Sequence, residues 1–155
     1  MKQNTGKINS IIKLFLLSSL IVFCNSNFAD IGNDSHFQLG QQYYQSGNYE
    51  EAIKIFAAIV ESEPENSVYH HWLGKSYGQL ARNSSLLKAY NLSIKSREQI
   101  ELAVELDDFN VEALTDLLEF YEQAPSFLGG GPEKADKIRL RLKELNNNEV
   151  EKPRV

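Results

Sequence analysis

The sequence predicts an all-α fold in which three helical hairpins stack one on the next. A Leu-Gly-x-x-Tyr motif occurs twice at a separation of 34 residues. Apolar side chains recur at helical spacing along the chain, and no stretch requires a strand. A chain of 155 residues allows one compact domain, which we place at residues 30–145.

The repeated motif defines the first two hairpins. Its positions pair as Leu39 with Leu73, Gly40 with Gly74, and Tyr43 with Tyr77. The small residues Gly40 and Ala52 are expected where two helices approach closely. Pro64 is expected to end the first hairpin, because proline cannot continue a helix. Capping boxes are predicted where the two helices begin, at Ser35 with Gln38 and at Asn48 with Glu51.

Residues 33–66 resemble a tetratricopeptide repeat. The family's spacing is met by Leu39-Gly40-x-x-Tyr43, followed by Ala52, Phe56 and Pro64. The resemblance implies a short right-handed α-solenoid with repeats at about residues 33–66, 67–110 and 111–145. It also implies a concave groove, lined by the first helix of each hairpin, in which a partner segment would bind.

The later repeats depart from the pattern. Asn110 aligns with Asn66 at a separation of 44 residues, so the second repeat holds about ten extra residues. We expect these to lengthen its turn and the front of its second helix. In the third repeat Leu118 takes the place of the motif glycine, and Pro125 is expected to end its first helix. Residues 146–155 are polar and are predicted to form a disordered tail.

Residues 1–29 have the features of a cleavable secretory signal peptide. Three lysines give a basic start, residues 14–23 form an almost unbroken apolar run, and small polar residues follow. The run is shorter than the roughly 20 apolar residues that a bilayer span needs. The sequence therefore predicts an exported protein, periplasmic or secreted, with no integral span after processing.

Cleavage is expected after Ser26 or after Ala29, and the two sites stay open as alternatives. The bulky Phe23 argues against lipid attachment at Cys24, because bacterial lipoproteins carry a small residue there. Processing removes Cys24, and with it any disulfide or thiolate chemistry. It leaves 13 Lys and Arg against 21 Asp and Glu, a net charge of −8. Such a balance argues against nucleic acid and against docking on anionic lipid.

Two features of the sequence could form chemical sites, a run of glycines and a pair of histidines. Gly129, Gly130 and Gly131 precede a helix start at Pro132, but no strand or Gly-Lys-Ser/Thr signature accompanies them, so a connector is expected. His70 and His71 are adjacent and point about 100° apart on a helix, which argues against metal chelation. We expect one of them at an interface and the other at the surface.

The acids of the third repeat's first helix recur along one face, and we interpret them as a solvated stripe. They are Glu112, Asp116, Glu119 and Glu122. No nucleophile, metal set or cofactor loop is predicted, so no enzyme activity, catalytic residue or cofactor is expected.

By the repeat alignment, nine residues would face the groove and contact a partner. They are Phe37, Gln41, Tyr44, His71, Lys75, Gln79, Thr115, Glu119 and Glu122. The predicted function is that of a non-catalytic adaptor or assembly factor that binds a protein or peptide segment. The alternative is a small-molecule or anion-binding accessory protein that uses the glycine loop. A homodimer is compatible with a short stack whose ends are exposed.

Overall fold

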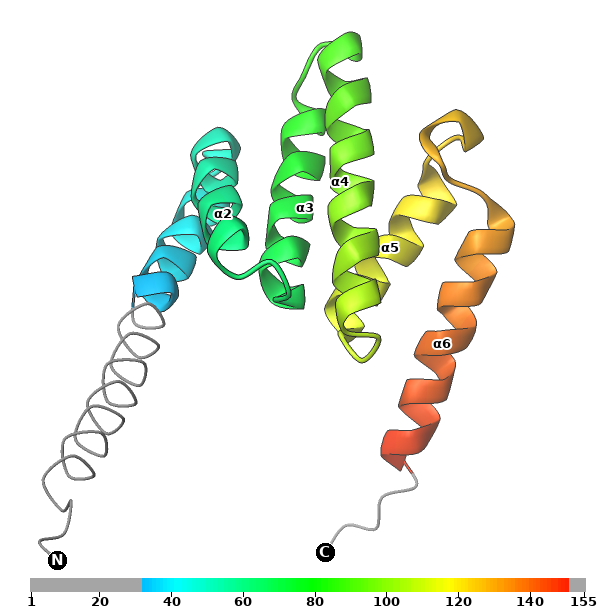
Figure 1. The fold of residues 1–155 in the computed structure, drawn as a ribbon. Helices are drawn as coiled ribbons and strands as arrows, with labels where there is room; N and C mark the ends of the chain where they lie inside the picture. Colours follow the sequence, from blue (N-terminus) through cyan, green and yellow to red (C-terminus); the bar gives the residue numbers. More distant parts are fainter. Residues whose placement is uncertain (1–31, 151–155) are drawn as a thin grey trace, which may run out of the picture. The chain divides into compact units, whose positions relative to one another are not determined.

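The computed structural model describes residues 32–150 and confirms the all-α repeat fold for that part of the chain (Figure 1). Residues 32–45 are helical. They are followed by α2 (Tyr49–Ser62), α3 (Ser67–Arg82), α4 (Leu86–Leu106), α5 (Val111–Gln123), the short 3-10 helix η1 (Ser126–Leu128) and α6 (Pro132–Val150). The predicted signal peptide, its cleavage sites and Cys24 lie outside the described residues.

The chain divides into two units, Met1–His36 and Phe37–Val155, and the stack belongs to the second. Its helices run alternately up and down, so its turns gather at two ends (Figure 1). We call the end with residues 46–48, 83–85 and 124–131 the upper end, and the end with residues 63–66 and 107–110 the lower end. Packing is sequential, because each helix from α2 to α6 contacts the next one along the chain.

The motif glycines lie where two helices of a hairpin touch. A Cβ added at Gly40 would lie 2.6 Å from the Phe56 ring, and one added at Gly74 would lie 2.6 Å from Ile100. Such distances are well inside van der Waals contact, so neither position admits a larger residue. Ala52 is fully buried beside this contact, as the sequence predicts for close helix approach.

The ten extra residues lengthen two helices and leave the turn unchanged. Against the first repeat, α3 gains its last three residues, and α4 (21 residues) gains seven at its start over α2 (14 residues). The turns at 46–48 and 83–85 have the same length. The expectation of a longer turn was therefore wrong, whereas that of a longer front to the second helix is confirmed.

The side chains that cap helices differ from the predicted ones. Asn66 and Asn110 hold equivalent positions, and their side chains accept hydrogen bonds from backbone N–H groups at the starts of α3 and α5. Ser35 lies inside the first helix and donates to the Gly32 carbonyl, so it is not a cap. Asn48 precedes α2 but makes no side-chain cap. Both predicted capping boxes were wrong.

The third repeat ends later than expected. Its second helix, α6, begins at Pro132 as predicted and continues to Val150, five residues beyond the expected end at 145. The part of the predicted disordered tail at residues 146–150 is thus helical, and residues 151–155 lie outside the described range. None of the helices within the described range has the length and hydropathy that a bilayer span requires.

Candidate functional site

A pocket of about 370 Å³ opens between α3, α4, α5 and the η1 loop. Its floor includes Ile100 of α4 and Phe120 of α5, and its walls carry small side chains such as Ala81 and Ala89. Helix α4 continues above the level at which α5 ends (Figure 1), and residues of both helices, of α3 and of the η1 loop line the pocket. Small wall residues and an apolar floor suit the insertion of a side chain from outside.

An ion pair beside a histidine joins α3 to α5 at the pocket. The His71 Nε2–H donates to Asp116 Oδ2 over 2.7 Å, and Lys75 Nζ lies 3.8 Å from the same oxygen. Lys75 also stands over two aromatic rings, 5.0 Å from the Trp72 centroid and 5.8 Å from that of Tyr44. The ammonium therefore faces both a carboxylate and two π-faces, which fixes its position at the pocket edge.

The electrostatics of this cluster favour an ionised carboxylate. Burial alone would raise the pKa of Asp116, but the hydrogen bond from His71 and the charge of Lys75 outweigh it and lower that pKa. The pKa of Tyr44 is raised by burial, against the opposing effect of its hydrogen bond with Gln79. At neutral pH the pocket edge thus presents a negative Asp116 and a neutral phenol.

A second pair crosses from α3 to α5 one turn higher. Arg82 Nη2 lies 3.5 Å from Glu119 Oε1, which also accepts a hydrogen bond from the Gln123 amide at 3.0 Å. Both charged side chains are about half exposed or more, so the pair contributes little to stability. Arg82 and Glu119 can therefore separate and pair with charges of a partner protein at a small cost in free energy.

Four of the nine predicted groove residues line this pocket, and they are Tyr44, Lys75, Gln79 and Glu119. His71 is only 1% exposed and supports the pocket from below through Asp116. Phe37 is partly buried and packs against Phe56, Tyr69 and Trp72, and it does not line this pocket.

The remaining three predicted residues lie outside the pocket. Thr115 donates to the Val111 carbonyl of its own helix. Glu122 pairs with Arg139 of α6 over 2.6 Å, which places it on the other side of α5, away from the groove. Gln41 is half-buried and does not line the pocket. The structure therefore brings together the central part of the predicted groove and not its two ends.

Sequence reasoning missed the part of the pocket that α4 and the η1 loop provide. Ala89, Ser93 and Ser96 lie on a second helix, whereas the repeat alignment assigns groove residues only to first helices. Their signal in the sequence is the recurrence of small side chains at spacings of four and three along α4. Arg82 was missed because it lies in the extension of α3.

The acidic stripe of α5 is not a uniformly solvated face. Asp116 is half-buried in the His71 and Lys75 cluster, and Glu119 and Glu122 form ion pairs with different neighbours. The single-face interpretation was wrong because α5 lies between α3 on one side and α6 on the other. Its acids are divided between two interfaces.

Both adjacent histidines are buried, which corrects the expectation that one would be at the surface. His70 is 4% exposed, and its Nε2–H donates to the Pro64 carbonyl over 2.8 Å, while Nδ1 lies 2.7 Å from the Gln99 amide. His70 therefore serves the interface of α3 with α4, and His71 that with α5. Among the residues that the structure describes, no three His, Cys, Asp or Glu side chains are grouped to hold a metal ion.

The glycine loop is a packed connector. The N–H groups of Gly129, Gly130 and Gly131 donate to the carbonyls of Ser126, Pro125 and Tyr121, so none of the three points outward to an anion. A Cβ at Gly130 would lie 1.9 Å from the Ala124 carbonyl oxygen, and one at Gly129 would lie 1.8 Å from Arg97 Nη1. These glycines are required by close packing, as a connector predicts.

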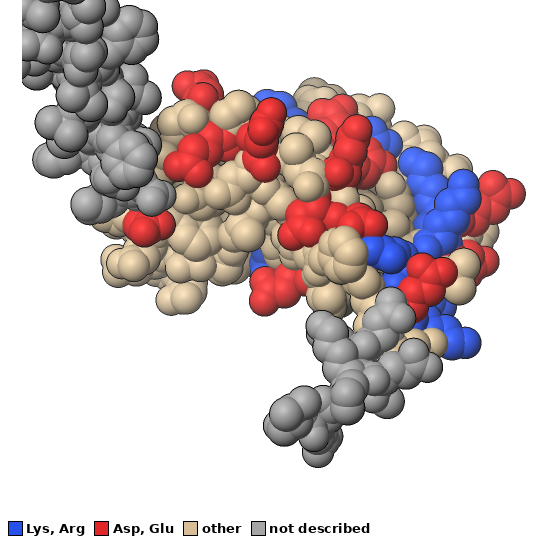
Figure 2. Space-filling model, turned by 60° about the horizontal axis from the view of Figure 1, so that its bottom comes forward, with Lys and Arg blue, Asp and Glu red and all other residues tan. Residues whose placement is uncertain are grey.

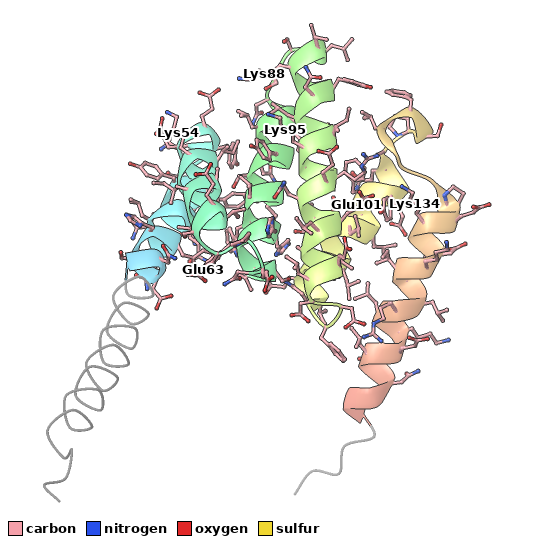
Figure 3. The ribbon with its side chains drawn as sticks, viewed as in Figure 1. Lys54, Glu63, Lys88, Lys95, Glu101 and Lys134 are labelled. Atoms are coloured by element: carbon pink, nitrogen blue, oxygen red, sulfur yellow. The ribbon has the colours of Figure 1, made fainter. Side chains whose placement is uncertain are left out.

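Arg97 fastens this loop to the stack. Its guanidinium donates to the Leu128 carbonyl over 3.0 Å and lies 3.5 Å from Glu101. Glu101 accepts a hydrogen bond from the Tyr121 hydroxyl over 2.6 Å and approaches Lys134 to 3.7 Å (Figure 3). Burial and this hydrogen bond raise the pKa of Tyr121. The network connects α4, α5 and α6, and it holds the pocket's η1 wall in place.

Comparison with known families agrees with the repeat geometry. Residues 34–66 match the family model of the tetratricopeptide repeat, over nearly the same residues as the resemblance in the sequence. No curated protein matches the chain. Repeats of this family are generally protein–protein interaction modules and are typically non-catalytic. The motif, the stacked hairpins and the family match agree that residues 34–66 form a tetratricopeptide repeat.

Proposed function

We propose that the protein is a non-catalytic adaptor or assembly factor that binds a segment of a partner protein at the pocket between α3, α4 and α5. The observation that carries the proposal is the pocket itself, which has an apolar floor and an edge of paired charges. A partner side chain would fill the space of about 370 Å³, while polar groups of the segment contact Lys75, Gln79 and Glu119.

The features of residues 1–29 support an exported location, in the periplasm or outside the cell. The alternative anion site at the glycine loop receives no support, since its three N–H groups are already bonded within the chain. A phosphate-bearing ligand would have to break these bonds before it could bind.

In-cell photo-crosslinking tests the proposal. A photoreactive side chain at Gln79, which lines the pocket, is compared with one at Glu98, which is exposed elsewhere on α4. We expect one recurrent protein to be captured from Gln79 alone. An additional Ala89→Phe change, which fills the pocket, should abolish the capture, whereas Glu98→Phe should not.

Equal capture from both positions, or capture that survives Ala89→Phe, would mean that the pocket is not the binding site. Loss of export after deletion of residues 1–29 would support the location, and it is scored separately by fractionation. The two parts of the proposal can thus fail independently.

A further inference from the structure

The lower end of the stack concentrates acidic side chains. Residues 61–68 and 104–112 form its two turns and the adjoining helix ends, and they contain no Lys or Arg. The first range holds Glu61, Glu63 and Glu65, and the second holds Glu105, Asp107, Asp108 and Glu112. The turns of the upper end, by contrast, contain no charged side chain. Figure 2 brings the lower end forward and shows acidic side chains spread across it, with Lys and Arg gathered toward one side.

Most of these acids are not neutralised by a neighbouring cation. Asp108 is paired, because Arg141 Nη2 lies 2.7 Å from its Oδ2. Within the part of the chain that the structure describes, no ion pair with Lys or Arg is formed by Glu61, Glu65, Glu105, Asp107 or Glu112. The lower end therefore carries a local excess of negative charge.

The stability of the helices does not explain these acids. The lower end holds the C-termini of α2 and α4, where the helix dipole and the last backbone carbonyls favour cations. Neither helix has a basic residue in its last turn. Glu61 and Glu105 stand there instead, and Glu63 and Asp107 are the C-cap residues. These charges repel one another and oppose the dipoles, so the lower end attracts cations from outside the chain.

A groove of about 620 Å³ lies between the two turns of the lower end. Its apolar side chains come from Pro64, Val68 and Leu106, and Glu65 and Asp107 are among the acids that line it. Val68 and Leu106 are 43% and 36% exposed, so the apolar part of the groove is open to a partner. The groove thus offers a contact for an apolar side chain inside an acidic rim.

We propose that the lower end docks a basic segment of a partner protein, in which an apolar side chain is flanked by Lys or Arg. The apolar side chain enters the groove between Val68 and Leu106, and its basic neighbours pair with Glu65 and Asp107. Charge complementarity selects this occupant, because acidic flanks would be repelled. The groove is separate from the pocket between α3, α4 and α5, so the chain can hold two segments at once.

A second copy of the chain fits the lower end less well. Most soluble dimers have two-fold symmetry, which places the same surface of each copy against the other. Such a pairing would bring the unpaired acids of both copies together, and like charges in contact oppose association. Nucleic acid and anionic lipid are repelled by the same excess of negative charge.

A peptide titration tests the proposal on the full chain. The probe is a fluorescein-labelled peptide in which two leucines stand between pairs of lysines, and its binding is followed by fluorescence anisotropy. We expect saturable binding that weakens as salt is raised, because charges at an exposed surface are screened. A peptide with Glu in place of every Lys, and one with Ser in place of every Leu, should each bind at least about tenfold more weakly.

Charge-neutralising variants locate the binding. Glu65→Gln with Asp107→Asn keeps the shape of both side chains and should weaken peptide binding at least about tenfold. Glu98→Gln with Glu133→Gln removes the same net charge from exposed acids away from the lower end, and it should leave binding unchanged. Ala89→Phe, which fills the other pocket, should also leave it unchanged.

Four results would overturn the proposal. They are no binding at low salt, equal losses from the two charge-neutralising pairs, undiminished binding of the peptide with Ser, and loss of binding in Ala89→Phe. A chain that self-associates without peptide, and becomes monomeric in Glu65→Gln with Asp107→Asn by light scattering, would overturn it in favour of a second copy.

Discussion

The first two repeats keep the same contact in helices of different length. Gly40 faces Phe56, and Gly74 faces Ile100 at the aligned position, with equal Cβ distances of 2.6 Å. Yet α4 has 21 residues where α2 has 14. The close glycine contact therefore sets how the hairpin packs, and the helices are free to lengthen beyond it at the upper end.

The added residues form the features that the first repeat lacks. Ala81, Arg82 and Ala89 lie in the two extensions and line the pocket, and Leu86 and Leu87 are exposed at the start of α4. The regular part of the second repeat supplies packing, and its insertion supplies part of the pocket lining and the most exposed leucines. The predictions below separate these two roles.

The largest loss of stability is expected when the glycine contact that the first two repeats share is removed. Phe56→Ala removes a fully buried ring against Gly40 and should lower the free energy of unfolding by about 3–5 kcal/mol. Ile100→Ala, at the equivalent position, should cost about 2–5 kcal/mol. Chemical denaturation measures both. A loss below about 1 kcal/mol at either position would mean that the contact does not control packing in that repeat.

The next largest loss of stability is expected at the interface of α3 with α5, between the second and third repeats. Asp116→Ala leaves the buried His71 N–H without its acceptor and should cost about 1–3 kcal/mol at pH 7. Because the pKa of Asp116 is lowered in the folded state, its stabilisation is present above the unfolded value of 3.8 and is lost as the pH falls through the lower folded value.

The difference in unfolding free energy between the native sequence and Asp116→Ala should therefore shrink from pH 7 to pH 3. Denaturation series at both pH values give the difference directly, and the other acids cancel in the comparison. A difference in unfolding free energy that stays constant over this range would show that the charge of Asp116 does not stabilise the interface of α3 with α5.

Gly130→Ala sharpens the contrast between a packed and an open turn. Its Cβ would meet the Ala124 carbonyl oxygen at 1.9 Å, and a backbone atom cannot move aside, so we expect a loss of about 1–3 kcal/mol. Gly47→Ala, at a positive φ of 78° with open space around it, should cost about 1 kcal/mol from strain alone. Equal losses measured by thermal unfolding would argue that the glycine loop is not tightly packed.

The smallest effect is expected at the insertion's outer surface. Leu86→Ser with Leu87→Ser should change the free energy of unfolding by no more than about 0.5 kcal/mol, because these side chains are 90% and 75% exposed. A large loss of stability would instead show that Leu86 and Leu87 contribute to the packing of the fold.

Most of the fold could be predicted from the sequence because it repeats. The Leu-Gly-x-x-Tyr motif and the alignment of Asn110 with Asn66 locate the hairpins, and Pro132 marks the start of α6. Helix ends were less predictable. Ser35 and Asn48 have the right chemistry for caps, yet the first helix already includes Ser35, and the Asn48 side chain bonds Ser46 instead.

The regular part of the repeat allowed the sequence to group some of the residues that line the pocket. Tyr44, Lys75 and Gln79 lie at the centre of the expected groove, and all three line one pocket in the structure. Phe37 and Glu122 do not line the pocket, because Phe37 packs against Phe56 and Glu122 pairs with Arg139 on the second helix of its own hairpin. The η1 wall depends on Arg97, whose contact with the glycine loop spans 31 residues and leaves no local signal.

The lower end is fastened by a short chain of hydrogen bonds. The Ser67 hydroxyl donates to the Ala103 carbonyl over 2.8 Å, and the Asn110 amide donates to the same hydroxyl over 2.9 Å. The beginning of α3, the end of α4 and the turn before α5 are thereby held at one level. Because the hairpins are held together at the lower end, their helices can differ in length at the upper end without changing how the repeats pack. Insertions or deletions near residues 83–85 can therefore create new surface while the next repeat keeps its place.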